Sequence, residues 1–69
     1  MQPYKNLSGD SPITGYEIGA GFIKVWFRGN SVAYRYSNHV GELTHLAEKG
    51  QGLATFINQH KTELPFTRG

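Results

Sequence analysis

The sequence contains no cysteine, and this absence excludes disulfide bonds and thiolate metal sites. It has no apolar run of the roughly 20 residues that a membrane-spanning helix needs, and Met1–Asp10 lacks the apolar core of a signal peptide. With 69 residues the chain makes one domain at most. We therefore expect a small cytoplasmic protein of bacterial type, with no membrane contact. Its stability must come from packing, for which four tyrosines, four phenylalanines and one tryptophan are available.

The sequence also has no large excess of positive or negative residues, since its formal net charge is only +2. This mildly basic balance permits a nucleic-acid partner without predicting one by itself. The three histidines, His39, His45 and His60, lack the i, i+4 spacing of metal-binding helices and have no further ligand. We expect solvated helix histidines, no metal and no cofactor. The chain also shows no nucleophile motif and no acid–base pair, so we do not expect an enzyme.

Glycine, proline and small polar residues divide the chain into a tail, strands and helices. Residues 1–12 mix loop-forming types and are expected to be a flexible tail, followed by one domain over 13–66, and Thr67–Gly69 is expected to fray. Alternating β-branched and aromatic residues predict three strands, and glycines predict the turns between them, the second of type II′. These strands are Thr14–Ile18, Phe22–Arg28 and Ser31–Ser37, with turns at Gly19–Gly21 and Gly29-Asn30.

After the third strand the apolar spacing changes to that of helices. Apolar residues recur at helical intervals over 40–47 and again over 53–57, which predicts two short helices. Ser37 or Asn38 is placed to cap the first helix, and Gly50 is placed to end it. The predicted fold is therefore α+β: a three-stranded antiparallel sheet followed by two helices packed on one face.

A two-residue Gly29-Asn30 loop divides the hairpin side chains between two faces, because strand side chains alternate. Val25 then lies opposite Tyr34, and Ile23 lies opposite Tyr36. The face that we expect the helices to cover carries Ile23, Val25, Phe27, Val32, Tyr34 and Tyr36. The second face carries Phe22, Lys24, Trp26, Arg28, Ala33 and Arg35.

The second face combines aromatic and basic side chains, as single-strand RNA readers do when they stack on bases and pair with phosphates. The candidate residues for binding RNA or single-stranded nucleic acid are Phe22, Lys24, Trp26, Arg28 and Arg35. Two other interpretations stay open. Glu17, Lys24 and Arg35 would also form an ordinary cross-strand charge row, with Trp26 covered by the tail or by Phe66. The same face would alternatively serve a protein partner or a second copy of the chain.

The hairpin and helices also contain an ordered set of motifs: an aliphatic–aromatic strand, a glycine turn, a Tyr-x-Tyr pair and a glycine break between helices. They are Ile23-Lys24-Val25-Trp26-Phe27, Gly29, Tyr34-Arg35-Tyr36, and Lys49-Gly50 leading into Phe56-Ile57. This set, over about Ile18 to His60, resembles the KTSC domain, the small module named after the C-terminus of some lysyl-tRNA synthetases, in a variant stand-alone form. The resemblance implies the fold predicted above, and RNA binding has been suggested for the family. Tyr34 and Tyr36 match its motif, although the register places them against the helices as structural residues.

A secondary candidate lies between the two predicted helices. Lys49, Gly50 and Gly52 precede the second helix, whose free N-terminal amides and neighbouring ammonium suit an anion. The segment does not match a Walker loop, and an ordinary interhelical turn explains it as well.

Overall fold

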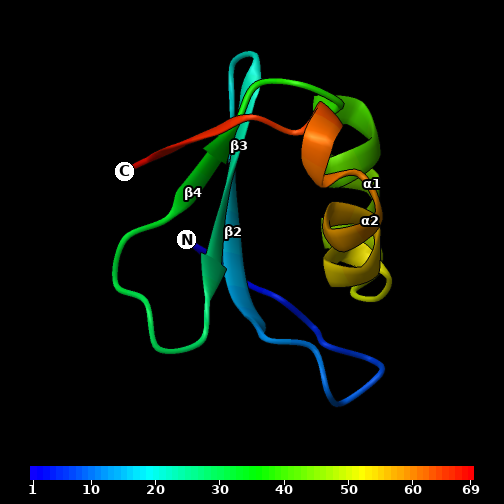
Figure 1. Cartoon of the computed structure of the whole chain (residues 1–69). Coiled ribbons are helices and arrows are strands. Elements are labelled where there is room, and N and C mark those ends of the chain that lie inside the picture. Colours follow the sequence, from blue (N-terminus) through cyan, green and yellow to red (C-terminus); the bar gives the residue numbers. More distant parts are fainter.

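The computed structural model describes residues 1–69 as a five-stranded antiparallel sheet with two α-helices on one face (Figure 1). The strands are adjacent in chain order: β1 (Gln2–Pro3), β2 (Ile13–Gly19), β3 (Phe22–Phe27), β4 (Tyr34–Tyr36) and β5 (Phe66–Arg68). The helices are α1 (Val40–Lys49) and α2 (Leu53–Gln59), followed by the 3₁₀ helix η1 (Lys61–Glu63). The α+β class is confirmed, but the predicted three strands were an undercount.

The edge strand β1 belongs to the segment that we expected to be a tail. Gln2 pairs with Tyr16 in β2, and Tyr4, which follows β1, is buried in the core. Asn6 and Ser11 then exchange two hydrogen bonds of 3.0 and 3.3 Å, which close the connecting loop. Residues 1–12 are therefore packed onto the domain.

The opposite edge strand, β5, occupies residues that we expected to fray. Phe66 pairs with Tyr36, and Thr67 pairs with Arg35. The Gly69 N–H also donates to the carbonyl of Ala33 at 2.9 Å. The chain therefore returns from the helices to the sheet, and β4 has a neighbour on each side.

The pairing of β3 with β4 has the predicted register. Ile23 lies opposite Tyr36, and Val25 lies opposite Tyr34. All four side chains point to the helix side, where Ile23 and Val25 are fully buried. An even number of loop residues is enough to produce this register, because a shift by one residue would reverse every side chain.

The loop between β3 and β4 is longer than predicted. The strand ends at Phe27, and Asn30 donates its N–H to the Phe27 carbonyl at 3.0 Å, with Gly29 at φ 83°. Gly29 is therefore the second central residue of the turn, and the predicted type II′ turn centred on Gly29-Asn30 was wrong. Because the chain leaves the ladder here, strand alternation stops: Val32 is exposed and Ala33 is buried, the reverse of our assignment.

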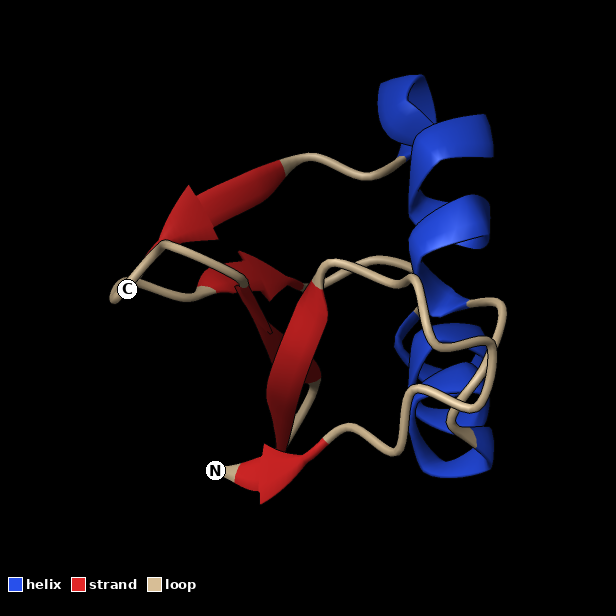
Figure 2. Cartoon of the chain, turned by 90° about the horizontal axis from the view of Figure 1, so that it is seen from below, coloured by secondary structure: helices blue, strands red, loops and turns tan.

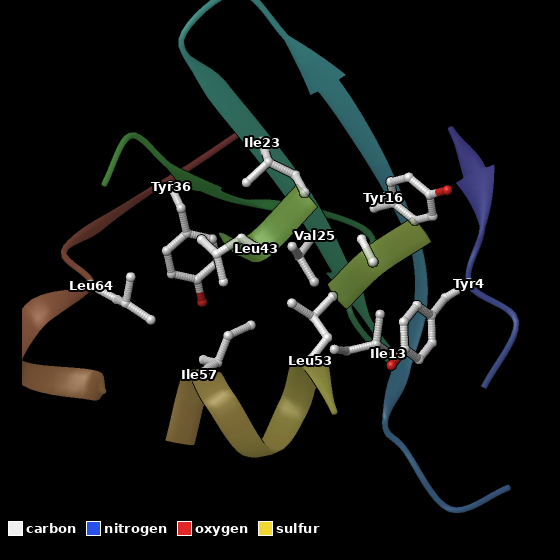
Figure 3. Close-up of a cluster of buried hydrophobic side chains, with 11 residues drawn as sticks. Tyr4, Ile13, Tyr16, Ile23, Val25, Tyr36, Leu43, Leu53, Ile57 and Leu64 are labelled. Atoms are coloured by element: carbon white, nitrogen blue, oxygen red, sulfur yellow. The ribbon is translucent and has the colours of Figure 1, made fainter. Parts of the chain in front are cut away.

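The core fills the space between the sheet and the helices (Figure 3). Its members come from the N-terminal segment, β2, β3, β4, both helices and the residue after η1: Tyr4, Ile13, Tyr16, Ile23, Val25, Tyr36, Leu43, Ala47, Leu53, Ile57 and Leu64. Each large apolar side chain buried in this way contributes about 1.5–3 kcal/mol. The packing fixes which face of the sheet the helices cover.

One end of α1 is as predicted and the other is not. Gly50 ends α1 in the left-handed region at φ 86°, as predicted. The N-cap is His39, at φ 53°, and neither Ser37 nor Asn38 caps the helix. The Asn38 amide donates instead to the Glu63 carbonyl at 3.3 Å, which joins the start of α1 to η1. Neither helix combines the length and the apolarity that crossing a membrane requires.

Candidate functional site

The helices and η1 all lie on one side of the sheet, and no helix covers the other side (Figures 1 and 2). Strand pairing determines which side chains this uncovered side carries. We call it the open face and define it by Glu17, Phe22, Lys24, Trp26, Arg35 and Thr67. Four of the five residues predicted for nucleic-acid binding therefore share one surface.

A row of charges crosses the open face. Lys24 lies between Glu17 of β2 and Arg35 of β4, as expected from the register. The Glu17 carboxylate, however, has its ion pair with the Met1 ammonium, at 3.8 Å. Lys24 and Arg35 form no ion pair with any carboxylate. Lys24 and Arg35 therefore stand directly opposite each other, and no carboxylate lies within ion-pair distance of either. Their mutual repulsion, which disfavours folding, is offset on the open face only by Glu17, the cross-strand neighbour of Lys24.

Phe22 supports one of these cations. The guanidinium carbon of Arg35 lies 4.0 Å from the centre of the Phe22 ring, within the range of a cation–π contact. The same ring lies over Gly19, where any side chain would collide with it. The pair presents the guanidinium of Arg35 to solvent, and a guanidinium plane can stack on a base as an aromatic ring does.

Trp26 is half-buried on the open face. Its cross-strand partner is Gly15, so no neighbouring side chain on β2 shields the indole directly. The Met1 side chain lies over Gly15, where an added Cβ would be 2.6 Å from its Sδ atom. Phe66, which we considered as a cover for Trp26, lies on the helix side and stacks on Tyr34 with 4.5 Å between ring centres.

Arg28, the fifth predicted residue, follows the last residue of β3. Its Nη2 atom donates to the Ser11 carbonyl at 3.4 Å, and its backbone N–H donates to the Pro12 carbonyl at 2.7 Å. Arg28 therefore holds the N-terminal loop against the end of the sheet. It is not brought together with Lys24 and Arg35 by strand pairing.

The secondary anion candidate is divided between buried and exposed residues. Gly50 is buried, the Lys5 side chain lies against it, and its carbonyl accepts the Leu7 N–H at 2.7 Å. Lys49 and Gly52 are exposed. The hollow beside Gly52 is also lined by Asp10, a carboxylate that opposes anion binding. The role of these residues stays a prediction.

The structure also contains a pocket that the sequence did not predict. It measures about 450 Å³ and lies between the helix side of β3–β5 and α2 with η1. Its sheet wall consists of Phe27, Tyr34, Tyr36 and Phe66. Burial, with the neighbouring Tyr34, raises the pKa of Tyr36 to about 12, so its hydroxyl is protonated at neutral pH. The register alone grouped three of these rings, whereas Phe66 comes from the unpredicted strand β5.

Two of the histidines form exposed pairs with carboxylates. Nδ1 of His39 lies 3.0 Å from Glu42, and Nδ1 of His60 lies 3.0 Å from Glu63. Glu63 is also 3.8 Å from Nε2 of His39. The structure has no group of three or more side chains suited to hold a metal ion. These contacts link α1 to η1.

Comparisons with protein-family models, curated proteins and solved structures gave no match to this chain. They give no support to the resemblance with the KTSC domain, which stays a prediction.

Proposed function

We propose that this protein is a small binding module for RNA or other single-stranded nucleic acid, and that the open face is its binding surface. The observation that carries the proposal is the pair Lys24 and Arg35, two adjacent cations without a carboxylate partner on a sheet face that no helix covers. A phosphate beside them would remove their mutual repulsion and would add charge-assisted hydrogen bonds.

The order of side chains along β3 also suits a single strand. Phe22 and Trp26 point to the same side and are four residues apart, or about 13 Å at 3.3 Å per residue. Lys24 lies between them. In the proposed complex one base stacks on Trp26, another stacks on Arg35 above Phe22, and Lys24 contacts the phosphates between the two bases.

Self-association through the same face is the other function that the sequence left open. A two-fold dimer places the same patch of both copies together. Here it would bring Lys24 and Arg35 of one copy close to the same cations of the other, because they lie at the centre of the row. The charges therefore favour an anionic partner, and the RNA binding suggested for the KTSC family agrees with that preference.

The test is a titration of a fluorescein-labelled oligouridylate with the protein at several salt concentrations. Two phosphate contacts predict that log K falls with log salt with a slope of about −1.4. Trp26→Ala should weaken binding about tenfold, because one stacked base contributes about 1–3 kcal/mol. Lys24→Gln should lower the slope by about 0.7.

Lys61→Gln is the matched control, because it removes the same charge from an exposed position in η1, on the helix side of the sheet. It should change neither the affinity nor the slope by as much as Lys24→Gln. No binding at low salt, binding without a salt slope, or equal effects of the two lysine variants would refute the proposal. Sedimentation equilibrium of the free protein separates these outcomes from self-association.

A further inference from the structure

The pocket on the helix side has the form of a site for a small flat molecule. Its volume of about 450 Å³ falls within the range of small-molecule sites. The rings of Tyr34 and Phe66 stack with 4.5 Å between centres, and Phe27 meets Tyr34 edge-on at 5.0 Å. Ile57 and Leu64 line the opposite wall. An aromatic wall facing an aliphatic wall favours a planar aromatic ligand.

The polar groups at this pocket favour a negative charge on that ligand. Lys61 and Asn58 are among the lining residues, and no acidic side chain is. Lys61 forms no ion pair. Arg68, also without an ion pair, lies with its guanidinium carbon 4.4 Å from the centre of the Tyr34 ring. Glu63, the nearest acid in sequence, is bound to His60 at 3.0 Å.

The buried part of the pocket adds a hydrogen-bond donor. The Tyr36 side chain is almost completely buried, and its hydroxyl points toward Ile57 and Leu64 (Figure 3). Asn58 offers an amide on the α2 side. The pocket therefore has an apolar interior with a few polar groups and a cation, which is the usual composition of a small-molecule site.

We propose that this pocket binds a small planar aromatic molecule that carries a carboxylate. The ring lies between the aromatic rings of the sheet and Ile57 with Leu64, and the carboxylate faces Lys61. The site is separate from the open face, because Tyr34 and Phe66 point to the helix side whereas Lys24 and Trp26 point away from it. It does not depend on nucleic-acid binding.

The probe is 2-naphthoate, titrated into the ¹⁵N-labelled protein while amide and side-chain signals are followed by NMR. The controls are 2-naphthalenemethanol, which is neutral, and 2-naphthylmethylamine, which is cationic. We expect saturable shifts at Tyr34, Ile57 and Phe66, with naphthoate binding at least threefold more tightly than the neutral control. Lys61→Gln should remove that preference while the ring still binds. Equal affinity for all three probes, no saturation, or shifts confined to the open face would overturn the proposal.

Lys24→Gln is the matched variant for the other surface. It should leave naphthoate binding unchanged and weaken RNA binding, whereas Lys61→Gln should have the opposite pattern. A protein that binds naphthoate in the pocket but no RNA would support the pocket and refute the proposed function. A protein that binds RNA but not naphthoate would support the open face and refute the pocket.

Discussion

Alanine substitutions at Gly50 and Gly52 form a matched pair that tests whether residues 1–12 belong to the folded domain. Both glycines have φ 86° in the turn between α1 and α2. They differ in what an added Cβ would meet. At Gly50 it would lie 2.6 Å from Cβ of Lys5, whereas at Gly52 the nearest atom is Cδ2 of Leu46 at 3.6 Å, an ordinary contact.

The difference in stability follows from these distances. Both variants place an L-residue in the left-handed region, which costs about 1–2 kcal/mol. Only Gly50→Ala also displaces the main chain at Lys5, because a Cβ cannot rotate away. This displacement strains the hydrogen bond from the Leu7 N–H to the Gly50 carbonyl, which is 2.7 Å long. The strain lowers the free energy of unfolding by about 1 kcal/mol more. We expect a total loss of about 2–3 kcal/mol for Gly50→Ala.

The assay is thermal and urea unfolding of both variants, followed by circular dichroism. At this chain length 1 kcal/mol shifts Tm by about 4–8 °C. Gly52→Ala should therefore lower Tm by about 4–16 °C, and Gly50→Ala should lower it clearly further. Amide exchange at Gln2 and Tyr4 should also accelerate in Gly50→Ala alone. Equal losses in the two variants would refute the claim that this segment packs on the interhelical turn.

Three further substitutions test the charges and the core. Glu17→Gln removes the carboxylate of the open face and should strengthen oligouridylate binding about twofold. The reason is that the repulsion between this carboxylate and a phosphate ~10 Å away in water is about 0.4 kcal/mol. Weaker binding would contradict the proposed surface. Tyr36→Phe should reduce, by roughly 1–2 kcal/mol, the loss of stability that the parent protein shows in urea unfolding as pH rises from about 10 to 12, because the unfolded tyrosine ionises first. Burial also raises the pKa of Tyr4, so part of the loss should remain. An unchanged pH dependence would count against the burial of the Tyr36 hydroxyl. Ile23→Ala should lower the free energy of unfolding in urea by about 2–5 kcal/mol, because Ile23 is fully buried beneath the helices. The RNA affinity of the folded protein should stay unchanged. A parallel loss of affinity would show that the two faces are coupled.

The central hairpin was predictable because two independent signals agree on it. Ile23 and Val25 alternate with less buried residues of the open face, and the spacing to Tyr34 and Tyr36 is even, so both strands bury the same face. Gly50 was predictable as a helix end because its left-handed conformation suits glycine. These features depend on local chemistry, which the sequence contains directly.

The edge strands were not predictable in the same way. β1 has two residues and β5 has three, too few to show an alternating pattern. Both pair because the rest of the fold brings them to the edges of β2 and β4. The same tertiary effect explains the errors at Val32 and Ala33, where the loop leaves the ladder, and at Arg28, which is bound to the N-terminal loop.

The two candidate surfaces also differ in how far the sequence could predict them. The open face follows from the register of neighbouring strands, so the alternation of side chains along the hairpin is enough to group Lys24, Trp26 and Arg35. The pocket requires Phe66 and Lys61, which join it only after the chain has passed through both helices. Surfaces built by pairing within one hairpin are therefore accessible to sequence reasoning, whereas the surface built by packing is not.

The central claim, that nucleic acid binds to the sheet face that no helix covers, is tested most directly by an NMR footprint of oligouridylate on the ¹⁵N-labelled protein at low salt. We expect the largest shifts at Phe22, Lys24, Arg35 and the indole N–H of Trp26, reversed by added salt. Shifts confined to the helices or to the helix-side pocket, or a spectrum that oligouridylate leaves unchanged, would contradict the claim.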